Sequence, residues 1–193
     1  MQPRQLIDFL NVIENLKNTT RHVWNASGRQ ESVAEHSWRL AVMALLVADE
    51  FPGLDTFKVI KMCLLHDLGE AITGDVPSFY KTELDEKKED AAIEELLGQL
   101  PAKLSSEFSE LFEEMHKLET EEAKLYKALD RMEAIVTHNT SPLETWLPLE
   151  YTENIVYGDE NVKHSEYLMQ IKEELKKDTR EKIKKGLKGQ IKV

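Results

Sequence analysis

The sequence predicts an all-α fold, and three observations lead to that prediction. Apolar residues recur at the spacing of amphipathic helices, as Leu6, Phe9 and Ile13 do near the start of the chain. No stretch alternates apolar and polar residues as a half-buried strand would. The 193 residues contain no internal repeat and no low-complexity linker, and they suffice for one full core. We therefore expect a single domain over residues 1–193, a bundle of seven to nine helices.

Capping residues and apolar spacing place the helices along the chain. Ser32 and Glu35 form a capping box, Asp55 and Thr120 are expected N-caps, and Pro101 begins a helix. The intervening polar segment 18–31 and the segment around Trp146 are expected to be irregular. The expected helices cover about 4–17, 32–50, 56–70, 85–97, 102–117, 120–139 and 163–188.

Composition narrows the classes of function and the compartment. The net charge of -11 argues against a general nucleic-acid or membrane surface. Cys63 is the only cysteine, so no disulfide can form within one chain. The first residues lack the apolar core of a signal peptide, and no apolar run is long enough to span a bilayer. We expect a cytoplasmic protein without nucleic-acid or membrane partners.

The segment 63–75 reads C-L-L-H-D-L-G-E-A-I-T-G-D and is the strongest candidate for a functional site. Burying an unpaired imidazole and carboxylate beside an apolar helix is costly, and a bound metal would offset that cost. Glu70 follows His66 by four residues and should share its helix face. Gly69 and Gly74 are expected to turn the backbone. The alternative is a helix end with a capped histidine and solvated acids.

Further ligands must come from other helices. His36 lies in the first turn of the helix that begins after Ser32, and Asp130 lies beside Leu129 on a later helix. For Asp130 taken alone, an ion pair with Arg131 or Lys127 is the favoured interpretation. Adjacent helical residues point about 100° apart, so the His66–Asp67 pair can meet one ion only if it lies between them.

Three stretches carry a resemblance to a known family. Arg21 stands fifteen residues before His36, segment 31–36 reads E-S-V-A-E-H, and segment 66–78 reads H-D-L-G-E-A-I-T-G-D-V-P-S. With Asp130, they resemble HD-domain metal-dependent phosphohydrolases, and more closely the YfbR-like 5′-deoxynucleotidases. That superfamily is all-α, which agrees with the independent helix prediction.

The resemblance covers 21–130, and residues 143–188 carry no diagnostic residue but are expected to belong to the same HD domain. It implies one divalent metal, for which Co²⁺, Mn²⁺, Zn²⁺ or Fe²⁺ would be suitable. It also implies a homodimer. The residue roles that it implies are metal binding by His36, His66, Asp67 and Asp130, acid–base catalysis by Glu70, and substrate binding by Arg21, His22, Asp75, Val76, Pro77 and Ser78.

The implied activity is metal-dependent hydrolysis of deoxynucleoside or nucleoside 5′-monophosphates to nucleoside and phosphate. The alternatives are a nucleoside triphosphate or cyclic nucleotide hydrolase on the same scaffold, and a regulatory helical domain that keeps the metal without turnover. One position departs from the family, where a tryptophan follows the arginine. Here His22 follows Arg21, and either Trp24 takes over that role or sugar discrimination differs.

The remaining histidines are interpreted as structural or solvated. His116 lies among charged residues, and His138 and His164 show no acidic or histidine cluster at ligand spacing. The extra histidines that a two-metal HD phosphodiesterase needs are not evident.

Overall fold

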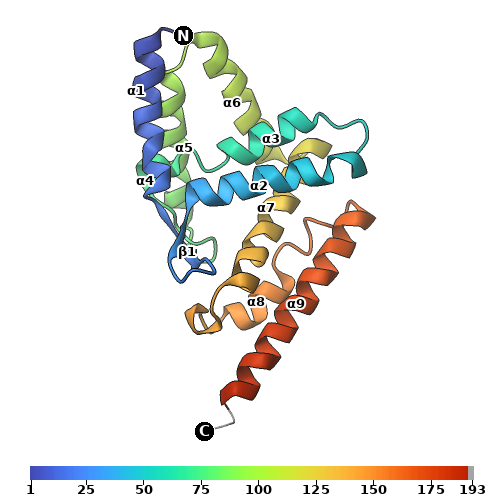
Figure 1. Ribbon diagram of the computed structural model, residues 1–193. Coiled ribbons are helices and arrows are strands. Elements are labelled where there is room, and N and C mark those ends of the chain that lie inside the picture. The colour runs from blue at the N-terminus through green and yellow to red at the C-terminus, as the bar shows by residue number, and fades with distance from the viewer. Residues whose placement is uncertain (191–193) are drawn as a thin grey trace.

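The computed structural model describes residues 1–190, and most of them are helical (Figure 1). The all-α prediction is confirmed, and the number of longer helices among these residues lies within the expected range. The end of the predicted domain, 191–193, lies outside the described residues. The helices are α1 (Pro3–Ile13), α2 (Val33–Val47), α3 (Thr56–Leu65), α4 (Glu70–Thr73), α5 (Glu83–Gly98), α6 (Ala102–Lys117), α7 (Glu121–Thr140), α8 (Glu150–Val156) and α9 (Glu166–Gln190). Short 3₁₀ helices cover Glu14–Lys17 (η1), Ala48–Glu50 (η2) and Leu143–Thr145 (η3).

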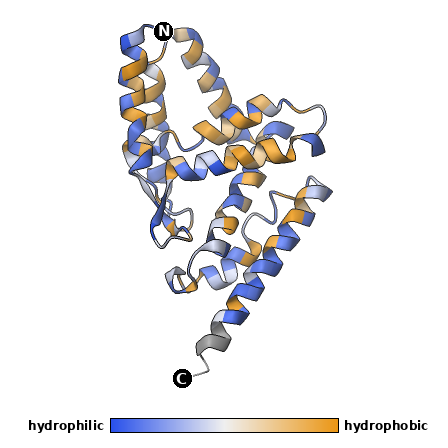
Figure 2. Ribbon diagram, in the orientation of Figure 1, coloured by the Kyte–Doolittle hydropathy of each residue, from blue (hydrophilic) through white to orange (hydrophobic). Residues whose placement is uncertain are grey.

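Helix α7 is the central element, and α2, α3, α6 and α9 pack against it. In Figure 1, α1, α5 and α6 lie towards the N-terminal end of the molecule, and α8 and α9 lie towards the C-terminal end. Figure 2 shows mainly apolar residues on α3 and mainly hydrophilic residues on α9. The fully buried side chains of Leu40, Met62, Leu129 and Leu168 belong to one core that joins α2, α3, α7 and α9. Within residues 1–190, no helix combines the length and the apolar character that a membrane crossing requires.

The predicted helix starts rest on the expected caps. The Ser32 hydroxyl accepts from the Glu35 backbone N–H, and the Glu35 carboxylate accepts from the Ser32 N–H, which completes the capping box. Asp55 and Thr120 cap α3 and α7 in the same manner. Helix α5 begins earlier than expected because Thr82 also forms a capping box.

The expectation that residues 18–31 lack strands is wrong. Strands β1 (Thr20–Trp24) and β2 (Gln30–Ser32) form an antiparallel hairpin, and Gly28 at φ 83° allows its turn. The register shifts between Thr20 and Trp24. Such an irregularity breaks the alternation of side chains, so strands this short leave no period-two pattern in the sequence.

The expected central helix 56–70 is interrupted, which is a second correction. Helix α3 ends at Leu65, and the chain makes tight turns before α4 begins at Glu70. Glu70 and His66 therefore do not lie on one helix face. Gly74 turns the backbone as expected, at φ 77°, but Gly69 has an ordinary φ of -59°. A Cβ at Gly69 would lie 3.0 Å from atoms of α5, so its role is close packing.

The C-terminal part departs from prediction at two points. Helix α8 was not expected, and α9 begins at Glu166, whereas 163 was expected. Helix α8 has only seven residues, and its buried Glu150 and Asn154 conceal the apolar pattern that would reveal it.

Candidate metal centre and cavity

Four side chains from separate parts of the chain converge at one point. They are His36 on α2, His66 and Asp67 directly after α3, and Asp130 on α7. His36 Nε2 and His66 Nε2 lie 3.2 Å apart, and Asp67 Oδ2 lies 3.0 Å from His66 Nε2. Asp130 Oδ1 lies 3.3 Å from His36 Nε2 and 3.7 Å from His66 Nε2. The end of α3 at Leu65 removes the difficulty of two adjacent helical ligands, since His66 and Asp67 reach the same point.

Each imidazole is oriented by its other nitrogen. His66 Nδ1 donates to the Cys63 carbonyl oxygen at 3.0 Å, and His36 Nδ1 donates to the Glu133 carboxylate. Because a neutral imidazole carries one proton, both Nε2 atoms then keep a lone pair, and these lone pairs face each other. The pair is unfavourable unless a proton or a cation lies between the two nitrogens. Metal-binding histidines are held in this manner.

The spacing of the four donors fits one divalent ion. Ligands about 2.1 Å from a metal lie about 3.0 Å apart at right angles and about 3.4 Å apart in a tetrahedron. The donor atoms here are separated by 3.0–3.9 Å where they face His36 or His66. Two imidazole nitrogens and carboxylate oxygens suit ions such as Zn²⁺, Co²⁺, Mn²⁺ and Fe²⁺. The residues therefore fit the metal that was expected from the sequence.

The pKa values of His36 and Asp67 also show that the surroundings favour positive charge at this point. Burial and the Arg21 cation lower the pKa of His36, but Glu133 and Asp130 outweigh them and raise it to about 9. Burial raises the pKa of Asp67, but the neighbouring His66 reverses this and holds that pKa below its usual value. The metal-free site thus holds a proton at neutral pH, and a metal ion would displace it.

Asp130 both pairs with Lys127 and faces the candidate metal centre, so the two interpretations drawn from the sequence hold together. Lys127 Nζ pairs with Oδ2 at 2.9 Å, while Oδ1 faces the two imidazoles. Burial raises the pKa of Asp130, but Lys127 and the imidazoles outweigh it and hold the pKa well below its usual value. The other considered partner, Arg131, instead lies over the Tyr157 ring, with Cζ 4.7 Å from the ring centroid.

Sequence reasoning missed a buried carboxylate behind the candidate metal centre. Glu133 is fully buried, accepts from His36 Nδ1, and pairs with Arg39 Nε at 2.6 Å. Arg39 also reaches Glu31, at 3.4 Å. A ligating histidine usually donates to such a carboxylate. One sequence signal could have identified Glu133. It follows Asp130 by three residues on α7, so both carboxylates lie on one helix face.

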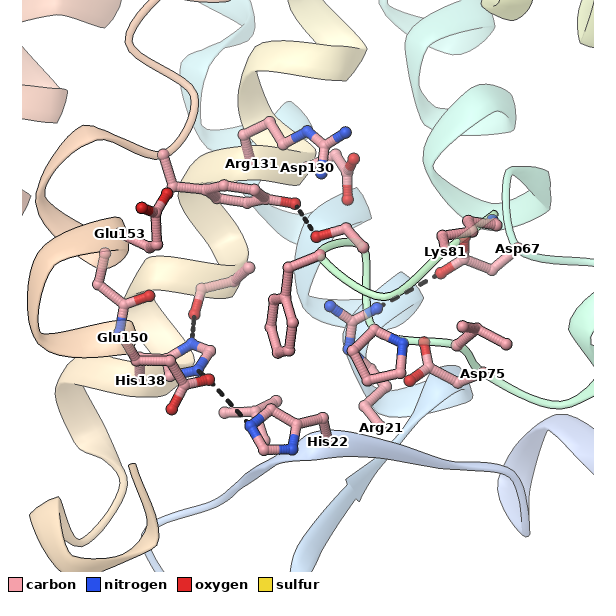
Figure 3. A pocket seen from close by; sticks show the side chains of 18 of the residues that line it. Arg21, His22, Asp67, Asp75, Lys81, Asp130, Arg131, His138, Glu150 and Glu153 are labelled. Atoms are coloured by element: carbon pink, nitrogen blue, oxygen red, sulfur yellow. Dashed lines mark hydrogen bonds and ion pairs between the residues drawn. The ribbon is translucent and has the colours of Figure 1, made fainter. Parts of the chain in front are cut away.

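A cavity of about 290 Å³ opens beside these residues, between β1, the segment 74–79, α7 and α8 (Figure 3). Among its lining residues, seven carry a carboxylate and four carry a lysine or arginine cation. This excess would repel a phosphate unless bound cations offset it. The carboxylates are Asp67, Glu70, Asp75, Glu86, Asp130, Glu150 and Glu153, and the cations are Arg21, Lys81, Lys127 and Arg131.

Arg21 projects into the centre of this cavity (Figure 3). Its Nη1 lies 3.5 Å from Asp67 Oδ2, and its Nε, 3.6 Å from Glu31 Oε2, is buried without a hydrogen-bond partner. A guanidinium with an unused donor beside a candidate metal centre is suited to an oxyanion. Three consecutive residues of β1, Arg21, His22 and Val23, line the cavity, and the pairing of β1 is irregular over this stretch.

Glu70 is buried at the cavity wall, and its Oε2 has no hydrogen-bond partner. Burial, followed by the carboxylates of Asp67 and Asp75, raises the pKa of Glu70 to about 10. Its carboxyl group is therefore protonated at neutral pH and can donate to a neighbouring oxygen.

The predicted substrate segment Asp75–Ser78 lines the same cavity. Burial raises the pKa of Asp75, although Arg21 opposes this. Ser78 Oγ lies 3.0 Å from the Tyr157 hydroxyl, which joins this segment to the end of α8. The cavity is thus lined by the residues expected to bind substrate, by Glu70, and by two of the four candidate metal ligands, Asp67 and Asp130.

His22 and His138 share one carboxylate, which sequence reasoning did not anticipate. His22 Nε2 lies 2.9 Å and His138 Nε2 lies 2.8 Å from Glu150 Oε1 (Figure 3). The interpretation of His138 as lacking an acidic or histidine cluster is therefore wrong. Nothing in the spacing of these residues reveals the cluster, because the irregular segment between α7 and α8 brings Glu150 back onto α7. Burial raises the pKa of Glu150, but the two histidines lower it to about 2.

The position of Trp24 bears on the departure noted in the sequence. His22 lines the cavity, whereas Trp24 is not among the lining residues of the described chain. The hairpin thus does not bring Trp24 into this cavity. His116 is exposed and pairs only loosely with Asp90, at 3.6 Å, as expected of a solvated face.

Comparison with known proteins agrees with the family resemblance of the sequence motifs. A family model described as HD domain matches residues 13–172. The chain is 36% identical to the 5′-deoxynucleotidase HDDC2 of Bos taurus over 137 residues, which cover 69% of this chain and 66% of that protein. It is 33% identical to the 5′-deoxynucleotidase hdd1 of Schizosaccharomyces pombe over 138 residues, 67% of this chain and 69% of that one. The chain thus spans about two thirds of the length of these relatives.

A solved structure shares nearly the whole fold. The crystal structure of a predicted metal-dependent phosphohydrolase from Magnetospirillum magnetotacticum MS-1 matches with a TM-score of 0.80 and 28% identity. The match covers 93% of each chain.

Proposed function

Because the chain belongs to the HD domain family, we propose that it is a metal-dependent phosphomonoesterase that hydrolyses deoxynucleoside or nucleoside 5′-monophosphates. It is a hydrolase of this family, and the curated relatives named above are 5′-deoxynucleotidases. The observation that carries the proposal is the convergence of two facing imidazoles and two carboxylates beside a cavity that contains Arg21.

The proposed metal ligands are His36, His66, Asp67 and Asp130. A divalent ion bound there would polarise the phosphate and lower the pKa of a bound water. The chain's own contribution is to fix the donors, through Glu133 behind His36 and the Cys63 carbonyl behind His66.

The proposed substrate residues have three tasks, which are to bind the phosphate, to protonate the leaving group, and to contact the sugar and base. The Arg21 guanidinium is placed to bind the phosphate oxygens in its fork. Glu70, protonated and without a partner, is placed to give its proton to the leaving 5′ oxygen. Asp75 to Ser78, together with His22, form the wall that would contact the sugar and base.

The size and charge of the cavity favour a small monophosphate. A volume of about 290 Å³ is at the lower end of ligand cavities, which run from about 300 to 1,000 Å³. The excess of lining carboxylates also disfavours the larger charge of a triphosphate. The cavity wall at His22 can hydrogen-bond a 2′-hydroxyl, so we propose a weaker preference for deoxynucleotides than a tryptophan wall would give.

The test is phosphate release from dAMP, AMP, a triphosphate and a cyclic nucleotide, each with several divalent ions. We expect release from the monophosphates, and loss of activity together with loss of metal in Asp67→Ala. Release from the triphosphate or the cyclic nucleotide alone would favour the alternative hydrolases. Metal binding without release from any substrate would favour a regulatory domain.

We also propose a homodimer in the cytoplasm. Large apolar side chains stand exposed on α2 and α3, among them Leu46, Phe57 and Trp38. Such side chains on neighbouring helices mark a surface that another protein can cover. Cys63 is a buried free thiol, which supports a reducing compartment.

A further inference from the structure

A second set of ligand-type side chains lies in the cavity wall, apart from the four ligands of the candidate metal centre. His22 on β1, His138 on α7 and Glu150 on α8 each offer one donor atom, and these three atoms lie within 4.8 Å of one another. Figure 3 shows the three side chains gathered on one side of the cavity, with Asp67 and Lys81 on the other. Three elements far apart in the sequence are needed to build this cluster.

His138 and Glu150 are each oriented by a hydrogen bond at the polar atom that does not face the cluster. His138 Nδ1 lies 2.8 Å from the Ala134 carbonyl oxygen and donates to it, which leaves Nε2 of the neutral ring with a lone pair. The Leu147 backbone N–H donates to Glu150 Oε2 at 2.7 Å, which leaves Oε1 directed at the histidines. This second layer of bonds is the arrangement that orients metal ligands.

In this cluster the lone pair of His138 Nε2 faces the Glu150 carboxylate. His138 Nε2 lies only 2.8 Å from Glu150 Oε1, and both are acceptors when His138 is neutral. Either an additional proton or a cation must lie between them. The separations of 2.8 and 2.9 Å from Glu150 Oε1 to His138 and His22 are hydrogen-bond distances, slightly shorter than the roughly 3.0–3.4 Å between ligands of one ion, so the three side chains need to move apart only slightly to hold one.

The cluster of His22, His138 and Glu150 is buried on the side of Glu150 and opens to the cavity on the side of His22. The side chain of Glu150 is only 3% exposed and that of His138 12%, whereas His22 is 25% exposed and lines the cavity. The rings of Trp146 and Phe79 pack edge-on against His138 and His22. An ion here would be shielded by aromatic rings and reachable from the cavity.

We propose that His22, His138 and Glu150 bind a second metal ion of the zinc type, with open coordination positions facing the cavity. Two histidines and one glutamate form a known ligand set for zinc with an open position, and imidazole favours Zn²⁺ or Co²⁺ over Mg²⁺. The ion would add positive charge to a cavity rich in carboxylates. The inference does not depend on the proposed phosphatase activity.

The experiment counts the ions bound by the full chain. The protein is dialysed against Co²⁺, passed through a desalting column and analysed for metal content, and the visible absorption of Co²⁺ is recorded. We expect two equivalents per chain in the wild type. His22→Gln and His138→Ala should each retain one equivalent and lose one component of the spectrum. Asp67→Ala should also retain one, with the complementary spectrum.

A matched control is His116→Gln, which changes an exposed histidine outside the cavity and should keep two equivalents. His22→Gln is the decisive variant, because His22 is partly exposed on a strand and its loss leaves the core intact. One equivalent in the wild type, or two in His22→Gln, would overturn the proposal and assign a proton to the cluster.

Discussion

At the residue scale, Glu70 illustrates how burial sets the chemistry of one group. Its side chain faces two neighbouring carboxylates and has an oxygen without a partner, and these conditions raise its pKa to about 10. A protonated acid beside a candidate metal centre is useful to a leaving oxygen but costly to a folded protein. The folded state keeps a proton that the unfolded chain loses above pH 4.5. This contribution to stability is full below pH 4.5 and declines as pH rises towards 10.

Glu70→Gln should therefore stabilise the metal-free protein while removing turnover. Gln is neutral at every pH, so the variant lacks the loss of stability that Glu70 causes as pH rises. We expect a higher Tm than wild type at pH 8 and a much smaller difference at pH 5. Each kcal/mol gained corresponds to roughly 2–4 °C in a chain of this size. Turnover should fall by roughly 10²–10⁴-fold with metal content unchanged.

Thermal unfolding at the two pH values, with metal analysis and phosphate release, checks this prediction. Glu86→Gln is the control, since Glu86 lines the same cavity but is exposed, and it should not shift Tm at either pH. A gain in Tm that is equal at pH 5 and pH 8 would contradict the account of Glu70.

At the element scale, the break between α3 and α4 positions the candidate site. The turns after Leu65 bring His66 and Asp67 to one point and place Glu70 at the first position of α4. Helix α4 has only four residues, so it depends on packing against α5. Gly69 makes that packing possible, because a side chain there would meet α5 directly.

Gly69→Ala should destabilise the protein and disturb the site. The added Cβ would lie 3.0 Å from the backbone oxygen of Glu89 and from Ile93 Cγ1, so α4 must move away from α5. Overpacking of this kind costs roughly 1–3 kcal/mol. Urea unfolding should show the loss, and turnover should fall because Glu70 moves with α4.

Gly98→Ala is the matched control for that substitution. Gly98 is the last residue of α5, and a Cβ there meets nothing within 4 Å. Helix propensity then favours alanine by up to about 1 kcal/mol. Equal unfolding midpoints for the two variants would show that close packing at Gly69 does not hold α4.

At the scale of the whole molecule, the exposed apolar side chains of α2 and α3 bear on assembly. Leu46 is 77% exposed, Phe57 68% and Trp38 65%, although both helices contribute to the core on their other faces. Scattered apolar residues are common on surfaces, but several on two adjoining helices favour an interface.

Leu46→Lys should dissociate the proposed homodimer. Placing a charge in an apolar interface costs its desolvation, so the variant should elute as a monomer where the wild type is a dimer. Light scattering coupled to gel filtration at micromolar concentration makes the measurement. The control is Leu84→Lys on α5, which is 62% exposed and should leave the dimer intact. A monomeric wild type would rule out the homodimer.

The sequence by itself determined the fold class, most helix starts and the candidate metal ligands. Helix starts depend on local bonds, such as the capping box of Ser32 and Glu35, and these can be recognised in a few neighbouring residues. The candidate ligands were found because a histidine and an aspartate beside an apolar helix need a partner, and because the surrounding motifs resemble a family.

Tertiary structure alone decided the β hairpin, the end of α3 at Leu65, and the contacts of Glu133 and Glu150 with histidines. Strands of three and five residues are stabilised by pairing and packing rather than by local preference, so their pattern is weak in the sequence. Glu133 and Glu150 meet histidines 97 and 12 residues away. A carboxylate's partner is fixed by the path of the chain between them, and no local rule contains that path.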